Sequence, residues 1–138
     1  MKNSSAKLFP ANSVLLAMYG ATVGEISILG KPATTNQAIC AILPNGDYPF
    51  SFVYEFLKSQ KERLENMAVG GAQQNISQTV IQAIEIFMPD QKTLKEFHSK
   101  ALTCYNLIKS NIEETQTLTI LRDSLLPKLM KGEIDLNN

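Results

Sequence analysis

The stretch KTLKEFHSKALTCYNLIKSNIEETQTLTILRDSLLPKLM, residues 92–130, decides the fold. It contains no glycine, its only proline is Pro127, and apolar residues recur along it three and four positions apart. This spacing predicts one α-helix, because residues three and four apart lie on the same helical face. At 1.5 Å per residue such a helix measures about 58 Å. Residues 1–90 are too few to form a core of that length.

The apolar side chains form a narrow row along this helix, and Gly132 is placed to end the helix in a left-handed conformation. Such a row needs a second helix to cover it. We therefore expect the helix to pair with a second copy of the chain, with another polypeptide, or with a further part of a longer chain. The residues expected at this helix interface are Leu94, Phe97, Ala101, Ile108, Ile112, Leu118 and Leu125.

The preceding residues predict short strands and one medium-length helix. Strands are expected at 13–18, 25–29 and 38–43, where apolar residues run together or alternate. The first two are separated by YGATVG, whose glycines we interpret as turn residues. Phenylalanine, leucine and valine residues at helical spacing predict a helix over 49–67.

The stretch before the long helix predicts one more helix and one more strand. Ser77 can cap a short helix over 78–82, and AIEIFM at 83–88 alternates in the manner of a strand. The expected fold class is α+β, a small mixed α/β module followed by a long coiled-coil-forming helix. Its parts are expected at residues 1–90, 91–131 and 132–138, the last being a short tail.

Composition and charge exclude several classes of protein. Apolar residues make up 44% of the 138 residues, and thirteen basic residues balance thirteen acidic ones. A neutral chain lacks the basic field that drives unaided DNA binding, so it would need basic partners to bind DNA tightly. Cys40 and Cys104 lie in apolar surroundings and are expected to be buried thiols rather than a disulfide.

No motif indicates catalysis, a metal site or a cofactor. The only histidine, His98, lies on the long helix, where a nucleophile and its base would have no cleft. The GATVG stretch lacks the spacing and the lysine of a phosphate-binding loop. Neither a signal peptide nor an apolar run of about 20 residues is present, so we expect a cytoplasmic protein without a membrane span.

An ordered set of short motifs resembles the specificity subunit of type I restriction–modification systems. No single motif is specific, but their order and spacing extend over almost the whole chain. They are Val14–Met18 with the YGATVG stretch, Asn36-Gln37, Gly71 with Gln74-Asn75-Ile76-Ser77, Ile84–Pro89 with Gln91, and the end of the long helix from Leu121-Arg122 to Gly132-Glu133-Ile134.

This resemblance implies a function in sequence-specific recognition of double-stranded DNA. In that family a target recognition domain reads one half of a split DNA target, and a long helix that follows it packs against a second such helix and sets the distance between the halves. The specificity subunit has no catalytic activity and no cofactor of its own. Methylation with S-adenosylmethionine belongs to modification subunits, and ATP-driven cleavage belongs to a restriction subunit.

The chain departs from the family pattern because it holds one recognition unit and one helix. Residues 1–90 correspond to only part of a recognition domain, so the chain is expected to be a truncated frame, a recombination cassette or a half-subunit. The alternative function is therefore an assembly or regulatory half-subunit, which pairs through its helix with itself or with another specificity subunit without reading DNA.

The loop GGAQQNIS, residues 70–77, is part of the shared family pattern, so it is a poor candidate for choosing between target sequences. Its amides and backbone N–H groups suit either fixing the loop or holding a phosphate oxygen. Base reading is expected from loops that differ between family members. The expected DNA-binding residues are Lys31, Thr34, Thr35, Gln73, Gln74 and Asn75.

Overall fold

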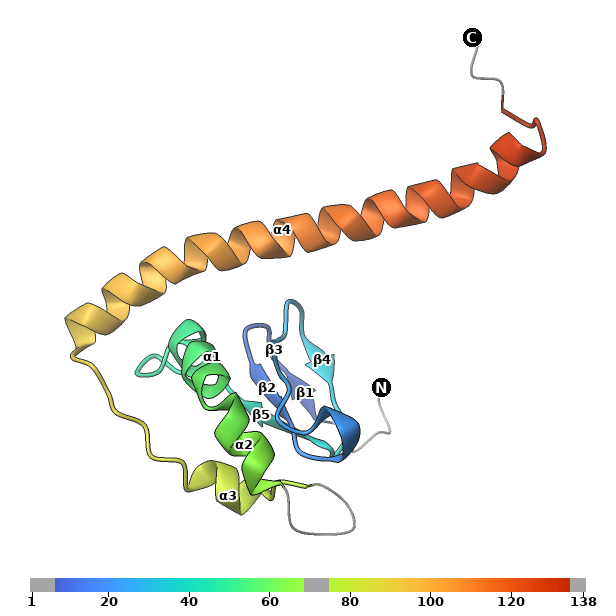
Figure 1. The fold of residues 1–138 in the computed structure, drawn as a ribbon. Coiled ribbons are helices and arrows are strands. Elements are labelled where there is room, and N and C mark those ends of the chain that lie inside the picture. Colours follow the sequence, from blue (N-terminus) through green and yellow to red (C-terminus); the bar gives the residue numbers. More distant parts are fainter. Residues whose placement is uncertain (1–6, 69–74, 135–138) are drawn as a thin grey trace. The chain divides into compact units, whose positions relative to one another are not determined.

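The structure is a computed structural model and describes residues 7–68 and 75–134. It divides into two compact units, residues 1–100 and residues 101–138. The elements are, in chain order, β1 (Leu8–Phe9), β2 (Val14–Ala17), the 3-10 helix η1 (Gly20–Thr22), β3 (Ile26–Ile28), β4 (Ala33–Thr34), β5 (Ile39–Ile42), α1 (Phe50–Ser59), α2 (Lys61–Met67), α3 (Gln78–Gln82) and α4 (Gln91–Met130) (Figure 1). This arrangement confirms the α+β fold class.

Strand β2 is the centre of a three-stranded antiparallel sheet with the order β3-β2-β5. Each of the three predicted strands is present, shorter by one residue at both ends. Strand β2 is apolar throughout, with Val14 and Leu16 almost completely buried, because a central strand has a neighbour on each edge and cover on its face. A separate two-stranded ribbon, β1 with β4, was not predicted.

The two glycines of YGATVG serve the turn between β2 and β3, as predicted. Gly20 and Gly24 have φ angles of 74° and 84°, a region that side chains with a Cβ rarely adopt. Gly24 is restricted further, since a Cβ there would lie 3.0 Å from Cγ of Glu65. The turn therefore also allows α2 to approach the sheet closely.

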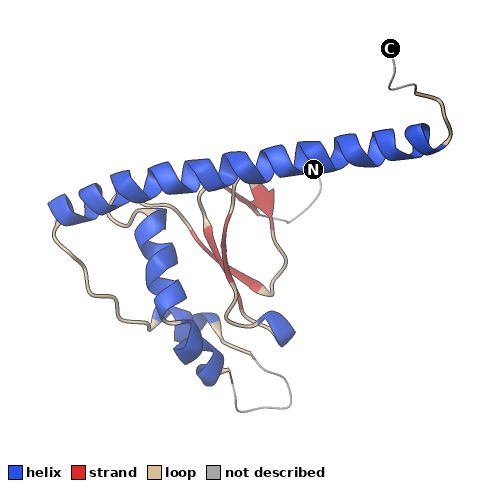
Figure 2. Ribbon diagram, turned by 45° about the horizontal axis from the view of Figure 1, so that its top comes forward, coloured by secondary structure: helices blue, strands red, loops and turns tan. Residues whose placement is uncertain are grey.

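The predicted helix over 49–67 is divided at Gln60 into α1 and α2. Gln60 has φ −96° and ψ 6°, outside the helical region, and ends one helix while it begins the other. The Ser59 hydroxyl donates to the carbonyl of Phe56 at 2.7 Å, and such side-chain bonds to the backbone compete with helical ones. Helix α1 packs against β2 and β3, so the helices lie beside the sheet (Figure 2).

The core of the module lies between the sheet, α2 and α3. Its buried residues are Leu16, Met18, Val23, Cys40, Leu64, Ala68, Ile76 and Ile81. Burial raises the pKa of the Cys40 thiol, as predicted for a buried free cysteine. Cys104 is instead exposed, so the prediction of burial was wrong there: an apolar helical row shows which residues share a face and not whether that face is covered.

The predicted strand over 83–88 is wrong, since these residues form neither a helix nor a strand. Ile84, Ile86 and Met88 are half-buried, whereas Glu85 and Phe87 are exposed. Alternation of apolar and exposed residues indicates that one side of an extended segment faces the core. It does not require a neighbouring strand: the first two residues of the segment donate backbone hydrogen bonds to α3, and Ile84, Ile86 and Met88 are half-buried.

The predicted long helix is confirmed as α4, which has 40 residues. Asp90 caps its start: one carboxylate oxygen accepts from the backbone N–H groups of Lys92 and Thr93, both at 3.0 Å, and the other accepts from the Thr93 hydroxyl at 2.6 Å. At its end Gly132 has φ 68° and donates to the carbonyl of Leu129 at 3.0 Å. Across the described ranges, no helix is long and apolar enough to cross a membrane.

The first turns of α4 complete the packing of the module. Leu94 is 2% exposed, and the completely buried Ser51 of α1 places its hydroxyl 2.8 Å from Nδ1 of His98. The Phe50 ring meets the His98 ring edge to face, with centroids 5.5 Å apart. A hydroxyl without exposure to solvent cannot reach a substrate, so the Ser51–His98 pair is a packing contact.

Replacement of Leu94 by alanine is expected to lower the free energy of unfolding by about 2–4 kcal/mol, because it leaves a cavity where the helix meets the module. Urea denaturation followed by circular dichroism measures this loss. Leu43→Ala is the matched control, since Leu43 is 47% exposed, and its expected change is about 0.5 kcal/mol or less. An equal loss in both variants would show that α4 does not contribute to the module's core.

Asp90→Ala is expected to destabilise the start of α4 at neutral pH and to have no effect in strong acid. The hydrogen bonds from the Thr93 hydroxyl and backbone hold the pKa of Asp90 below its ordinary value of 3.8. A depressed folded-state pKa means that the stabilisation is complete above the ordinary value and is lost as the pH falls through the folded value. Unfolding curves of both proteins along a pH series measure this convergence. A difference that grows in acid would contradict it.

Candidate nucleic-acid interface and helix surface

Two of the predicted DNA-binding residues, Lys31 and Asn75, lie near opposite ends of β2. The β3–β4 connection, which holds Lys31, is fixed near the start of β2, where the Leu29 N–H donates to the Ser13 carbonyl at 2.9 Å. Asn75 forms an isolated bridge with Tyr19, just beyond the end of β2. Six residues of extended chain separate Ser13 from Tyr19, about 20 Å at 3.3 Å per residue. Figure 1 shows these two ends of the sheet. Lys31 and Asn75 therefore do not form one site.

The described end of the glycine- and amide-rich loop has a structural role. The Ile76 N–H donates to the Met18 carbonyl at 2.8 Å, and the Ile76 side chain is 1% exposed. The Ser77 hydroxyl accepts from the Val80 N–H at 3.3 Å and caps α3, as predicted. Gln73 and Gln74 lie outside the described residues, so their part in DNA binding stays a prediction.

The two predicted threonines differ in their positions. In the β1–β4 ribbon Leu8 is opposite Thr34, and Phe9 is opposite Ala33. Directly opposed residues share a face, and burial agrees: Leu8 and Thr34 are exposed, whereas Phe9, Ala33 and Thr35 are half-buried. Thr34 therefore faces outward, and Thr35 lies on the inner side of the ribbon.

Sequence reasoning missed Lys7, which lies beside the predicted residues. Its side chain is exposed, and its Nζ lies 5.7 Å from the centroid of the Phe9 ring. An ammonium over an aromatic face is held by the ring quadrupole. Only the register of β1 against β4 reveals this neighbourhood. Both strands have two residues, too few to produce a periodic signal in the sequence.

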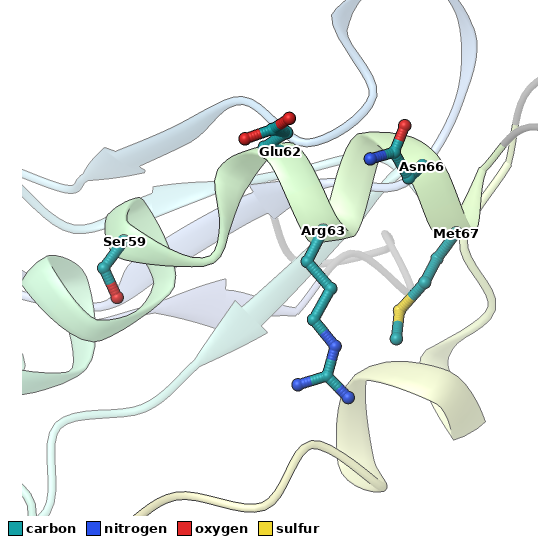
Figure 3. A pocket seen from close by; sticks show the side chains of 5 residues that line it. All are labelled: Ser59, Glu62, Arg63, Asn66 and Met67. Carbon is teal, nitrogen blue, oxygen red and sulfur yellow. The ribbon is translucent and has the colours of Figure 1, made fainter.

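A shallow pocket lies along one side of the α1–α2 pair (Figure 3). Its volume is about 460 Å³, and it is lined by Ser59, Glu62, Arg63, Asn66 and Met67. Figure 3 shows Arg63 and Met67 extending to one side of α2, whereas Glu62 and Asn66 extend to the other. These side chains do not converge on one point. In the part of the chain that the structure describes, no three histidine, cysteine or acidic residues are grouped for a metal ion.

The helix interface residues divide into one covered residue and an exposed row. Leu94 is already buried in the module. Ile108, Ile112 and Leu118 are each more than half exposed, and Phe97 and Leu125 are more than a third exposed. Ala101 is half-buried. Sequence reasoning left out further exposed apolar residues of α4, namely Leu107, Ile120, Leu126 and Met130.

The spacing of this row indicates how a second helix would cover it. Positions 94, 97, 101, 104 and 108 are three and four apart in alternation, and positions 118, 125 and 129 continue the same seven-residue repeat. A strict seven-residue repeat on a helix of 3.6 residues per turn leads to a left-handed supercoil. Asn111, Thr115 and Arg122 interrupt the apolar row, and polar residues at such positions fix the register of a helix pair.

Comparisons with known proteins give similarity along both the module and α4. Residues 1–122 match the model of the family described as type I restriction modification DNA specificity domain. The HindI specificity subunit of Haemophilus influenzae, a type I restriction enzyme subunit, is 37% identical over 133 residues, 94% of this chain and 29% of that protein. The MjaIX specificity subunit of Methanocaldococcus jannaschii is 25% identical over 140 residues, 97% of this chain and 32% of that protein.

A solved structure has the same fold. It is the crystal structure of the S subunit of a type I restriction–modification system from M. genitalium, with a TM-score of 0.64 and 27% sequence identity over 88% of this chain and 33% of that one. The chain thus spans about a third of the length of these relatives. Because the family model covers the module and most of α4, the chain belongs to the family of type I restriction–modification DNA specificity domains.

Proposed function

We propose that this chain recognises one stretch of double-stranded DNA within a type I restriction–modification complex. It directs methylation by a modification subunit and cleavage by a restriction subunit, and it carries no catalytic group and no cofactor itself. A cytoplasmic location is part of this proposal. The single observation that carries it is the match of residues 1–122 to the DNA specificity family. Relatives named as specificity subunits support it.

The net charge of the chain supports joint binding of DNA by this chain and the modification subunit. Thirteen basic residues against thirteen acidic ones give a net charge of zero. Counterion release from phosphates supplies most of the affinity of unaided DNA-binding proteins and requires a surplus of cations. The chain therefore contributes selection, whereas the modification subunit contributes most of the affinity. The predicted DNA-binding residues Lys31, Thr34, Thr35, Gln73, Gln74 and Asn75 belong to this proposal.

The exposed apolar row of α4 supports a second role, in assembly. A helix pair with a fixed register acts as a spacer, because each helical residue adds 1.5 Å to the distance between the domains attached at its ends. Two modules joined through such a pair would stand at a defined separation along DNA. In this proposal residues 1–90 are the recognition part and residues 91–131 are the dimerisation and spacer helix.

The same row favours one alternative function. A half-subunit that pairs through α4 with itself, or with another specificity subunit, would assemble or regulate a complex without reading DNA. Ile108, Ile112 and Leu118 would mediate this pairing, and the module would make no base contact. The alternative shares the helix interface with the main proposal and differs from it only at the module.

Reconstitution with a modification subunit tests the main proposal. The complex is mixed with a pool of random duplex DNA, the bound fraction is sequenced, and one short sequence is expected to be enriched because base-edge contacts discriminate between duplexes. The modification subunit without this chain is the control. A stable complex that enriches no sequence would overturn recognition and leave the assembly function.

Pairing through α4 is tested with the double variant Ile108→Asp, Leu118→Asp. It is expected to be monomeric in light scattering at concentrations where the wild type is dimeric, because an unpaired carboxylate in an apolar seam is costly to desolvate. Asn106→Asp adds one carboxylate, half the charge of the double variant, at an exposed position outside the predicted interface and is expected to remain dimeric. A monomeric wild type at micromolar concentration would exclude self-pairing.

A further inference from the structure

The loop between β5 and α1 holds a residue pair that occurs once in this chain. Asn45 is followed by Gly46, and none of the other asparagines of the sequence precedes a glycine. Residues 43–48 are all exposed, and a Cβ built on Gly46 would have no atom within 4 Å. Because glycine has no side chain, the Asn45 side chain can approach the backbone nitrogen of Gly46 without steric hindrance.

A hydrogen bond holds the Asn45 side chain against the backbone that follows it. Its Oδ1 accepts from the Asp47 N–H at 2.9 Å, which is the side-chain turn that asparagine favours. The ring that this bond closes contains both Cγ of Asn45 and the backbone nitrogen of Gly46. The Gly46 N–H donates no hydrogen bond to another described residue. An electrophilic carbon and an unbonded backbone nitrogen therefore share one compact turn.

This arrangement supports one reaction, which needs only the chain and water. The Gly46 nitrogen loses its proton to solvent base and attacks Cγ of Asn45, so that an N–Cγ bond forms and the carbonyl electrons move to Oδ1. The Cγ–Nδ2 bond then breaks, Nδ2 takes a proton and leaves as ammonia, and a cyclic succinimide remains. Water opens the ring at either carbonyl and leaves aspartate, or isoaspartate with the main chain running through Cγ. One water is consumed for each ammonia released, and nothing is oxidised or reduced.

The Asp47 N–H is placed to assist the closure of the ring. Negative charge develops on Oδ1 of Asn45 as the nitrogen attacks, and this oxygen already accepts from the Asp47 N–H at 2.9 Å. A donor fixed about 2.7–3.1 Å from an oxygen that gains charge lowers the barrier. Because water competes for the same oxygen on an exposed loop, the expected effect is that of one ordinary hydrogen bond.

Asn36 provides an internal comparison, because it forms the same side-chain turn. Its Oδ1 accepts from the Ala38 N–H at 3.1 Å, and its side chain is exposed. The residue that follows it is Gln37, whose side chain restricts the backbone at the nitrogen that would attack. Asn45 therefore differs from Asn36 in the one feature that controls access to Cγ.

We propose that Asn45 is a site of spontaneous deamidation, with the Gly46 nitrogen as nucleophile and the Asp47 N–H as donor to the developing oxyanion. The product places a second carboxylate beside Asp47. Thirteen basic residues then stand against fourteen acidic ones, because one acid is added to thirteen, and a net negative charge opposes approach to a polyanion. The inference goes beyond the proposed function, since the chemistry needs no DNA and no partner subunit.

Incubation of the folded chain at mildly alkaline pH, followed by proteolysis and mass spectrometry, tests this site. The peptide that contains Asn45 is expected to gain the mass difference between a hydroxyl and an amino group, and the peptide that contains Asn36 is expected to stay unchanged. The rate is expected to rise with pH, because the attacking nitrogen must lose its proton. Asn45→Gln is expected to stay unmodified, since its longer side chain would have to close a larger ring.

Two variants of Asp47 isolate the donor. Asp47→Ala keeps the backbone N–H, whereas Asp47→Pro removes it. The proline variant is expected to deamidate about two- to tenfold more slowly than the alanine variant, the range of one net hydrogen bond. Because Asp47 is exposed, both variants are expected to keep the wild-type circular dichroism spectrum.

Three results would overturn the inference: an unmodified Asn45 in the wild type, modification of Asn36 as fast as that of Asn45, or equal rates in the alanine and proline variants. None of these results bears on DNA recognition, which the enrichment experiment with the reconstituted complex tests separately.

Discussion

The structure depends on one constraint: α4 carries an apolar row whose side chains are exposed in the single chain. Within residues 1–100 the start of this row is covered, where Leu94 is buried and His98 meets Ser51 and Phe50. Beyond that point Ile108, Leu118 and Leu125 continue at heptad spacing, each with more than a third of its surface exposed. Exposed apolar area of this extent is typical of an interaction surface, because covering it removes apolar groups from water.

The module itself is organised around β2. This strand has a neighbour on both edges, and the residues after its end are bonded to the chain that leads into α3, through the Ile76 N–H and the Met18 carbonyl. The start of the strand is tied to the β3–β4 connection. The β3–β4 connection and Asn75 are thus held near opposite ends of one strand, about 20 Å apart at 3.3 Å per residue.

In the proposed function, the net charge of the chain and its local surface contribute differently to DNA binding. A neutral chain gains little affinity from phosphates as a whole, so its own contribution has to come from local contacts. The pocket along α1 and α2 mixes Glu62 with Arg63, and this pairing of opposite charges gives a polyanion no net attraction.

The sequence alone determined α4, the three strands of the sheet, the glycine turn at Gly20 and Gly24 and the cap at Ser77, because each of these follows from local periodicity or backbone restriction. Tertiary structure decided the rest. Residues 83–88 alternate like a strand, but whether a neighbour pairs with them depends on contacts far along the chain, and none does. Leu8 lies opposite Thr34 only through the register of β1 against β4, and strands of two residues leave no periodic pattern in the sequence. Local patterns report which side of a segment is buried. They do not show which segment covers the buried side. The sequence therefore predicted the helices and strands, whereas only the tertiary structure shows which of them pack together.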